Sequence, residues 1–334
     1  MNVLVIGGTG LISTGIVKHL IKRNANITLF NRGKRESTLP KGIETIAGDR
    51  GDFATFEAEM KSRKFDVVID MICFNPRQAE SAVRAFAGRC EQFIFCSTVC
   101  AYGVAIPSNV LIDETFPQNP ISQYGREKLA CEDIFLRAHD AGQFSTTIIR
   151  PSHTYGPGHF LIDNLEFNPT SWDRIQRNLP VLCAGDGLGL WVSTHRDDCG
   201  KLFAHASMNP RTYGQCYNAT RDRAFTWRDY YREAAAALGK KAQVIFMPAS
   251  WILARDAARF NLLREITQFH GAYTSEKARR DVPEFFCEIE FGRGAAETFA
   301  DVRRRNAWKS STDDNMYQTM VDEAFAMGID PIEA

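Results

Sequence analysis

The sequence lacks several features that would place it outside the ordinary globular proteins. None of its 334 residues belongs to an apolar run near the ~20 residues that a membrane-spanning helix requires. Forty basic residues balance forty acidic ones, so no overall charge attracts nucleic acid or an anionic membrane. The N-terminal apolar run is too short for a signal peptide and has no basic flank. These absences predict a cytoplasmic protein with neither a membrane nor a nucleic-acid partner.

Cysteine is present but is not arranged for metal binding. The nine cysteines form no C-x-x-C pair, and the closest two, Cys96 and Cys100, have no neighbours that complete a zinc-ligand set. His153, His159 and His195 match no helix-based or loop-based ligand spacing. The sequence therefore predicts buried free thiols in a reducing compartment, and no metal site.

The first 150 residues alternate short apolar runs with amphipathic segments. The runs that are typical of strands occupy residues 3–6, 27–30, 43–47, 66–70, 92–96 and 146–150. The segments between them have helical periodicity. Strands without strict polar alternation, separated by helices, are typical of a parallel sheet covered on both faces. The sequence predicts an α/β domain with a doubly wound, Rossmann-type sheet over residues 1–150.

The composition changes after residue 150, where Gly, Pro, His and Trp become frequent. Such a loop-rich stretch favours a substrate-binding lobe, and we expect residues 151–334 to form this smaller α/β lobe, with some segments returning to the first domain. The elements expected in the lobe are a helix at 226–238 capped by Thr226, a strand at 243–247, helical segments from 276 onward and a flexible joint at 310–314.

A glycine-rich segment follows the first predicted strand directly and precedes a helix. Small residues let the backbone turn tightly and approach a pyrophosphate, which binds the unpaired N–H groups of the helix N-terminus. Ser13 stands at the third small position, where glycine is usual, and is small enough to preserve the helix–strand contact. The cofactor-binding residues predicted here are Gly7, Thr9, Gly10, Leu11 and Ile12.

The end of the second predicted strand indicates which dinucleotide binds. A carboxylate there binds the ribose 2′-OH of NAD, whereas an arginine accommodates the 2′-phosphate of NADP. Here the strand ends in Asn31-Arg32, with no acidic residue before Glu36. These residues favour NADP(H), with NAD(H) as the alternative. After the third strand, Asp49 is a candidate acceptor for the adenine amino group, and Arg50 beside it is a further cofactor candidate.

Tyr124 and Lys128 stand at the start of a predicted helix with the i, i+4 spacing that places both on one face. A phenol with a pKa of about 10 is a poor acid–base catalyst at neutral pH. An adjacent ammonium stabilises the phenolate and lowers that pKa, and can also hydrogen-bond the cofactor ribose. Upstream, the strand at 92–96 leads into the hydroxyl residues Ser97 and Thr98, at the sheet edge where ligands of such sheets bind.

The glycine loop, the S-T-x-x-x-Y-G strand end and the Y-x-x-x-K pair together resemble the extended short-chain dehydrogenase/reductase family, in its sugar epimerase/dehydratase branch. The resemblance runs from Gly7 to about Phe299. It implies that Thr98 hydrogen-bonds the substrate oxygen, that Tyr124 is the acid–base residue and that Lys128 is its partner. It also implies a homodimer, because relatives often pair helices into a four-helix bundle.

Other motifs refine this resemblance. It implies that Pro151 lies beside the nicotinamide, and that His195 precedes a helix for which Asp197 is the expected cap. Many nucleotide-sugar relatives carry an arginine four residues before His195, directed at the substrate diphosphate. Here that residue is Trp191, which can stack on a ring but cannot neutralise a phosphate. The candidate substrate-binding residues are Ser97, His153, His159 and Trp191.

Three functions stay open at this point. The leading interpretation is an epimerase or dehydratase that oxidises a secondary hydroxyl of a sugar or nucleotide sugar to a transient ketone, with Tyr124 taking the proton. The second is an NADPH-dependent ketone reductase that consumes its cofactor, which Arg32 favours. The third is an RNA-binding or regulatory protein on a dehydrogenase fold, since the turn at residues 31–33 resembles a branch that includes chloroplast RNA-binding relatives. The complete catalytic set and the balanced charge argue against it.

Overall fold

The structure, a computed structural model, describes residues 1–33, 39–104 and 111–334. The chain forms two compact units. Unit 1 consists of Met1–Thr154, Thr194–Arg221 and Tyr273–Glu288, and unit 2 consists of Tyr155–Ser193, Asp222–Ala272 and Ile289–Ala334. The first segment of unit 1 ends at Thr154, near the boundary expected after residue 150. Two later segments of the chain return to unit 1.

A parallel sheet forms the centre of unit 1, with seven strands among the described residues in the order β11-β6-β5-β4-β1-β2-β3. The strands are β1 (Asn2–Ile6), β2 (Asn26–Asn31), β3 (Glu44–Ala47), β4 (Phe65–Asp70), β5 (Cys90–Cys96), β6 (Ser145–Pro151) and β11 (Gln215–Ala219). The chain winds outward from β1 in both directions, which confirms the doubly wound prediction. Ligands of such sheets bind outside the carboxyl ends of the strands, where the winding reverses.

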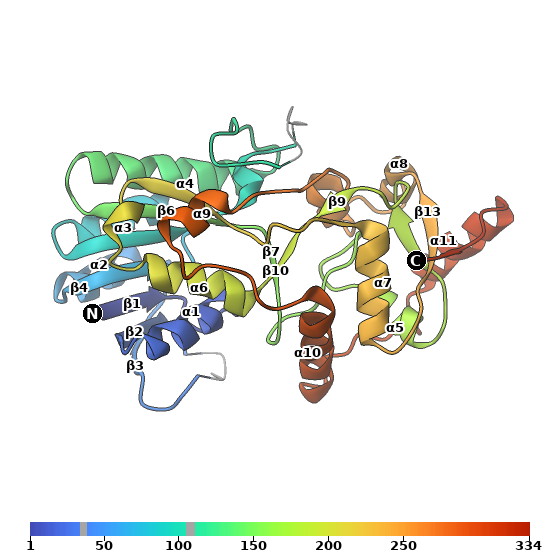
Figure 1. Cartoon of the computed structure of the whole chain (residues 1–334), viewed down its shortest axis with the longest axis horizontal. Coiled ribbons are helices and arrows are strands. Elements are labelled where there is room, and N and C mark those ends of the chain that lie inside the picture. Colours follow the sequence, from blue (N-terminus) through green and yellow to red (C-terminus); the bar gives the residue numbers. More distant parts are fainter. Residues whose placement is uncertain (34–38, 105–110) are drawn as a thin grey trace. The chain divides into compact units, whose positions relative to one another are not determined.

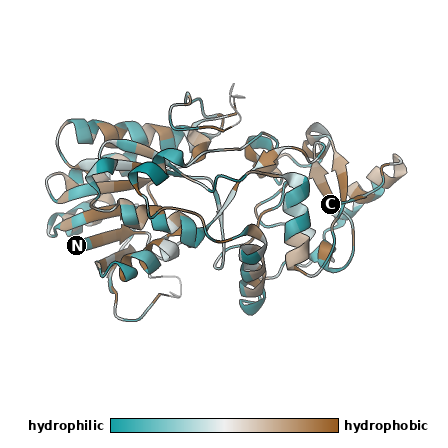
Figure 2. Cartoon of the chain, viewed as in Figure 1, coloured by the Kyte–Doolittle hydropathy of each residue, from teal (hydrophilic) through white to brown (hydrophobic). Residues whose placement is uncertain are grey.

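Helices cover both faces of this sheet (Figure 1). Apolar residues of α1 (Leu11–Lys22), α6 (Arg196–Ala206) and α9 (Glu276–Asp281) pack on one face. Those of α2 (Phe53–Lys61), α3 (Pro76–Phe86) and α4 (Gln123–Asp140) pack on the other. In Figure 2 the strands are mostly hydrophobic while the helices carry both colours, as expected for a sheet buried between two amphipathic layers. Short 3₁₀ turns complete the unit at Val99–Ala101 and Pro210–Thr212.

α1 and α6 approach each other unusually closely, and two glycines permit it. A Cβ at Gly15 would lie 2.3 Å from the carbonyl oxygen of Arg196, and a Cβ at Gly200 would lie 2.4 Å from the carbonyl carbon of Gly15. Both contacts involve backbone atoms, which cannot rotate away. The helix after the dinucleotide loop is therefore fixed against a segment that returns from much later in the sequence.

Unit 2 is built from shorter elements. Its helices are α5 (Ser171–Gln176), α7 (Trp227–Ala237), α8 (Ala249–Leu253), α10 (Phe291–Arg304) and α11 (Asn315–Ala326), with a π-helical turn at Leu263–Thr267. Its strands are β8 (Val181–Ala184), β9 (Leu190–Trp191), β12 (Phe225–Thr226), β13 (Gln243–Met247) and β14 (Ile332–Glu333). They form the small sheets β14-β13-β8 and β12-β9. Two further strands, β7 (His153–Tyr155) and β10 (Ser193–His195), span points where the chain passes between the units.

The expected helix at 226–238 and strand at 243–247 are confirmed as α7 and β13, and Thr226 caps α7 in a reciprocal capping box with Asp229. The cap expected at Asp197 is wrong. His195 is the N-cap of α6 and accepts from the Asp197 N–H, whereas the Asp197 carboxylate pairs with Lys18. The N-cap of α6 is thus the imidazole of His195, and the Asp197 carboxylate in the first turn of α6 binds Lys18 of α1.

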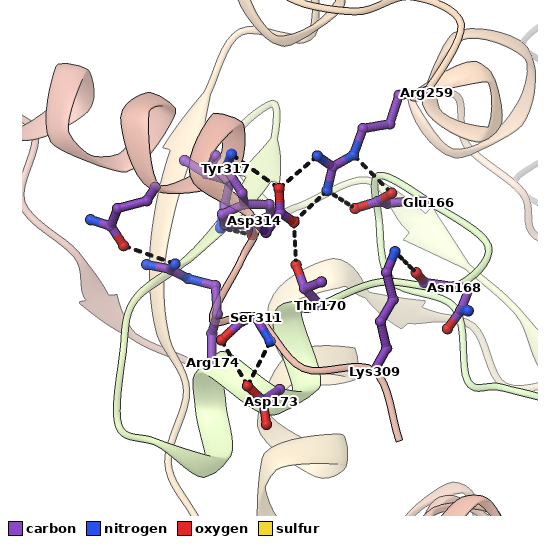
Figure 3. A network of polar contacts seen from close by, with 12 residues as sticks. Glu166, Asn168, Thr170, Asp173, Arg174, Arg259, Lys309, Ser311, Asp314 and Tyr317 are labelled. Atoms are coloured by element: carbon purple, nitrogen blue, oxygen red, sulfur yellow. Dashed lines mark hydrogen bonds and ion pairs between the residues drawn. The ribbon is translucent and has the colours of Figure 1, made fainter. Parts of the chain in front are cut away.

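The flexible joint expected at residues 310–314 is instead tied down by polar contacts (Figure 3). Ser311 is 5% exposed, and its N–H and hydroxyl both donate to Oδ2 of Asp173. Asp314 caps α11 and accepts two hydrogen bonds from Arg259, which also binds Glu166 through two more. The polar composition indicated flexibility, but these side chains have partners on distant segments.

Within the described ranges, no helix is long and apolar enough to cross a membrane, and no cluster of His, Cys, Asp and Glu is arranged to bind a metal ion. All nine cysteines are free thiols, and six of them are buried.

Candidate active site

The glycine loop joins β1 to α1 in a conformation that depends on glycine. Gly7 has a φ of 82°, and a Cβ there would lie 2.5 Å from Cγ2 of Ile72. α1 begins after Gly10, which offers no side-chain cap. The first N–H groups of α1 therefore receive no cap from a side chain, and the positive end of the helix dipole faces the loop. This cradle fits the pyrophosphate of a dinucleotide.

Ser13 does not loosen the loop. Its side chain is 1% exposed, and its hydroxyl donates to the carbonyl oxygen of Gly7 across 2.7 Å. The serine that replaces the usual glycine thus adds a hydrogen bond between the first turn of α1 and the loop.

A cavity of ≈ 640 Å³ lies beside the loop, within unit 1. This volume falls in the range of about 300–1,000 Å³ that is typical of ligand pockets. The predicted cofactor residues that line it are Gly7, Thr9, Gly10, Asn31, Arg32, Asp49 and Arg50. The described lining does not include Leu11, Ile12, Tyr124, Lys128 or Pro151. The cavity therefore brings together the residues expected at the phosphates and the adenosine, and fits that part of a dinucleotide.

Arg50 and Asp49 lie differently in this cavity. Arg50 is 3% exposed, and its Nη2 donates to the carbonyl oxygen of Gln78 across 2.6 Å and lies 3.6 Å from Oδ2 of Asp70. Asp49 is exposed, and its Oδ1 accepts from the Gly51 N–H. Arg50 thus forms part of the cavity wall, while Asp49 is the more accessible of the two.

Arg32 follows β2 directly, is exposed and lines the cavity with Asn31 and Gly33. A guanidinium there can bind a phosphate through two parallel hydrogen bonds. Glu36, the first acidic residue after this strand, lies outside the described residues.

α4 begins where its sequence favours a helix start. The Ser122 hydroxyl accepts from the Gly125 N–H across 3.0 Å and caps the helix. A Cβ at Gly125 would lie 2.6 Å from the Cys100 carbonyl oxygen, so the first turn packs closely on the turn that follows β5. This packing brings Tyr124 and the turn carrying Thr98 together.

Lys128 lies one helical turn beyond Tyr124 and is 1% exposed. Its Nζ donates to the carbonyl oxygens of Cys73 (2.8 Å) and Cys96 (2.6 Å), which follow β4 and end β5. An ammonium has three N–H donors, so these two bonds fix its direction and leave one donor for a ligand. Lys128 therefore lies at the carboxyl edge of the sheet, with one hydrogen-bond donor to offer.

Tyr124 does not have the lowered pKa that its spacing from Lys128 predicts. Burial raises the phenol pKa above its ordinary value, nearby Cys96 and Cys100 add to the rise, and a side-chain hydrogen bond with Thr98 opposes it. The residue as a whole is 43% exposed, whereas Thr98 is 7% exposed. Lys128 contributes little because its ammonium bonds two carbonyls and lies 5.8 Å from the ring centroid.

The side chains of Thr98 and Ser97 contact different residues. The Thr98 side chain accepts from the Cys100 N–H across 3.2 Å and lies close enough to the Tyr124 phenol to oppose the rise of its pKa. The Ser97 hydroxyl donates to the buried carboxylate of Glu132. The structure thus brings Thr98, Tyr124 and Lys128 together as predicted, whereas Ser97 faces the protein interior.

The remaining predicted substrate residues do not form one group within a unit. His153 belongs to unit 1 and is half-buried. His159 belongs to unit 2, where it is exposed beside the ring of Phe160. Trp191 is 6% exposed in the core of unit 2, stacked on Trp227 with ring centroids 4.9 Å apart. The burial of Trp191 argues against its proposed role as a platform for substrate.

Phe74 and Glu132 are among the residues of the site that were not predicted from the sequence. Phe74 is 44% exposed, lines the cavity and has its ring 4.9 Å from Nζ of Lys128. Its place in the loop that follows β4, at the ligand-binding edge, was the available signal. Glu132 lies four residues beyond Lys128 on α4, and that helical spacing was the signal for it.

The fold and this group of residues define an enzyme of the NAD(P)-dependent oxidoreductase type. The sequence model described as the NAD dependent epimerase/dehydratase family matches residues 3–219. This match covers more than half of the chain, and the chain belongs to that family.

Individual relatives differ in what they are named for. A 2'-dehydrokanamycin reductase of Streptomyces kanamyceticus is 28% identical over 251 residues, which are 75% of this chain and 70% of the reductase. The chloroplast stem-loop binding protein of 41 kDa b of Arabidopsis thaliana is 26% identical over 257 residues, 71% of this chain and 63% of that protein. The UDP-glucose 4-epimerase of Thermus thermophilus, solved with NAD, has a TM-score of 0.71 at 20% identity and covers 91% of this chain and 99% of its own. That last likeness concerns the fold alone.

Proposed function

We propose that the chain is an NADP(H)-dependent reductase of a keto group on a sugar or sugar-like ring. The observation that carries the proposal is the grouping of Thr98, Tyr124 and buried Lys128 at the carboxyl edge of the sheet, in the unit whose glycine loop borders the dinucleotide cavity. A bound reduced nicotinamide supplies the hydride to such a group.

The chain's own residues supply the remaining chemistry. The Thr98 hydroxyl donates to the carbonyl oxygen of the substrate and orients it. Tyr124 donates the proton that this oxygen takes up when the carbonyl carbon is reduced, and a raised pKa keeps the phenol protonated for this step. The free N–H of Lys128 binds the cofactor ribose and stabilises the phenolate that Tyr124 becomes.

Two features favour net reduction over the redox-neutral cycle that led the sequence interpretation. Arg32 lies on the cavity and suits the 2′-phosphate of NADP, an exchangeable cofactor of reductases. The relative named a reductase matches three quarters of the chain. We further propose a substrate without a diphosphate. Trp191 is a core residue where many nucleotide-sugar relatives have an arginine.

The test is a screen of keto sugars, keto aminosugars and nucleotide-linked keto sugars that follows NADPH absorbance and product together. We expect stoichiometric loss of NADPH with a keto substrate that lacks a diphosphate. Product formation without net loss of reduced cofactor, on a UDP-, dTDP- or GDP-sugar, would overturn this proposal in favour of the epimerase.

Redox-neutral epimerisation of a nucleotide sugar is the second candidate, favoured by the family to which the chain belongs. RNA binding is a third, because a stem-loop binding protein is among the relatives. It predicts salt-sensitive retention of a stem-loop RNA. We expect no such retention, because the chain has a formal net charge of +0.

We also propose that the protein is a homodimer in the cytoplasm. The dimer is tested by sedimentation, which should give twice the 37.6 kDa of the chain. A single species at the mass of one chain would contradict it.

A further inference from the structure

A single buried carboxylate joins the elements that carry the candidate catalytic residues. Glu132 lies on α4, four residues beyond Lys128, and is 1% exposed. Its Oε1 accepts from the Ser97 hydroxyl and from Nε of Arg150 (2.9 Å). Its Oε2 accepts from Nη2 of Arg150 (2.6 Å) and from the Gln118 amide (3.1 Å). Each oxygen thus accepts two hydrogen bonds, and the donors lie on three segments other than α4.

The contacts continue beyond Arg150. Its Nη1 donates to the Tyr102 hydroxyl (2.9 Å), which donates to Oδ1 of Asn218 on β11 (2.8 Å). The Asn218 amide then donates to the carbonyl oxygens of Ile112 and Thr274, each at 3.2 Å. The ion pair is therefore anchored on β6, β11 and two loops, and α4 cannot shift without breaking buried hydrogen bonds.

We propose that Glu132 is a positioning residue, which acts through Ser97 to keep the Thr98 hydroxyl against the phenol of Tyr124. Ser97 and Thr98 are adjacent at the end of β5, and Thr98 has an extended backbone, with φ −163° and ψ 151°. The Ser97 N–H donates to the Ile149 carbonyl oxygen across 2.7 Å. The N–H and the hydroxyl of Ser97 are both hydrogen-bonded, so the backbone that leads into Thr98 is fixed. The position of the Thr98 side chain is fixed with it.

This inference rests on the proposed function and assigns Ser97 a new role. Ser97 was predicted to bind substrate, but the residue is 2% exposed and its hydroxyl is bonded to Glu132. Reacting groups need to be placed to within about 0.5 Å, and such placement depends on the hydrogen bonds behind them.

Ser97→Ala removes one hydroxyl and leaves the Glu132–Arg150 ion pair intact, so the variant is expected to fold. Ser311→Ala is the matched control, because it removes a buried hydroxyl that donates to a carboxylate, Asp173, in unit 2. With the keto sugar reduced fastest in the screen, Ser97→Ala should lower kcat about tenfold to a hundredfold. The Kd of NADPH should stay within about twofold, since cofactor binding does not depend on the contact between Thr98 and Tyr124.

A second readout needs no substrate. Protein labelled with [¹³Cζ]tyrosine and saturated with NADP⁺ at neutral pH reports the surroundings of the Tyr124 hydroxyl, whose signal is the one missing from Tyr124→Phe. Ser97→Ala should change the chemical shift of this signal, because the Thr98 side chain is no longer held against the phenol. The control should leave the chemical shift unchanged.

The possible failures are distinguishable. Turnover that persists in Tyr124→Phe refutes the proposed function. If Tyr124→Phe is inactive but Ser97→Ala has wild-type kcat, or if Ser311→Ala lowers kcat equally, only the positioning role falls. Should the screen return no substrate, an unchanged Tyr124 chemical shift in Ser97→Ala refutes that role by itself.

Discussion

The buried ion pairs of units 1 and 2 have different roles. In unit 1, the pair Glu132–Arg150 lies directly behind candidate catalytic residues, while a long parallel sheet organises the unit. In unit 2, Arg259 bridges Glu166 and Asp314 to connect a loop to the start of α11 (Figure 3). The strands of unit 2 are two to five residues long, so their ladders connect few segments. In unit 2, ion pairs between side chains connect segments that strand pairing does not connect. In unit 1 the sheet connects the segments, and the buried ion pair instead supports the candidate site.

The largest expected effect is on the site of unit 1. Tyr124→Phe should lower kcat by about 10²–10⁴-fold, because it deletes the proton donor and leaves packing unchanged. NADPH binding, measured by calorimetry, should stay within a few-fold. Tyr231→Phe, which deletes a buried hydroxyl bonded to the Leu182 carbonyl oxygen in unit 2, should cost about 1 kcal/mol of stability and leave kcat unchanged. Equal losses of kcat in both variants would contradict the assignment of the catalytic site to unit 1.

The sequence predicted most of unit 1, because its signals are local. The apolar runs, the glycine loop and the i, i+4 spacing of Tyr124 and Lys128 lie within short windows, and the strands and the grouping with Thr98 follow from them. β11 was missed because Gln215 and Asn218 interrupt the apolar pattern at this edge strand. The raised pKa of Tyr124 was missed because it depends on burial, which spacing does not reveal.

Unit 2 was less predictable because its contacts join distant segments. The polar stretch at 310–314 indicated a flexible joint, yet its partners Asp173 and Arg259 lie far away in the sequence. Trp191 looked available to a substrate, but its stacking on Trp227 is a tertiary contact. Elements with local caps, such as α7 with Thr226, were predicted correctly even here.

The next largest effect concerns helix packing. Gly200→Ala should destabilise unit 1 by about 3 kcal/mol, because the new Cβ would lie 2.4 Å from backbone atoms of Gly15 and Ile16. Gly292→Ala, in the first turn of α10 of unit 2, meets nothing within 4 Å and should stabilise by about 0.5 kcal/mol. Urea denaturation measures both. Similar changes in the two variants would contradict the close approach of α1 and α6.

A smaller effect depends on pH. Burial, with the nearby Glu166 carboxylate, raises the pKa of Asp163 to about 7. An unfolded chain releases this proton near pH 4, so its contribution to stability is complete below about pH 4 and is lost as the pH rises to about 7. Asp163→Asn keeps an oxygen for the N–H groups of Leu165 and Glu166. It should therefore be more stable than wild type at pH 8 by about 2 kcal/mol.

Urea denaturation at pH 5 and pH 8 checks this prediction. The gain should shrink at pH 5, where wild-type Asp163 is already neutral in the folded chain. Asp186→Asn is the control in the same unit, since that exposed carboxylate accepts from the Leu188 N–H in a similar turn. A gain for Asp163→Asn that is the same at both pH values would show that ionisation of Asp163 is not its cause.

The smallest expected effect is on cofactor choice and returns to unit 1. Arg32→Ala should weaken NADPH binding about tenfold, or about 1.4 kcal/mol, and leave NADH binding unchanged. The side chain is exposed, so solvent screens its attraction for the 2′-phosphate and limits the gain. Arg84→Ala is the control, because this exposed arginine of unit 1 pairs with Glu57 and is absent from the described lining of the cavity. Calorimetry with both dinucleotides at two salt concentrations separates a local contact from a general charge effect, since a contact through Arg32 loses its salt dependence in Arg32→Ala alone. Equal or tighter binding of NADH by the wild type would reverse the assignment to NADP(H), and would return the redox-neutral cycle to first place.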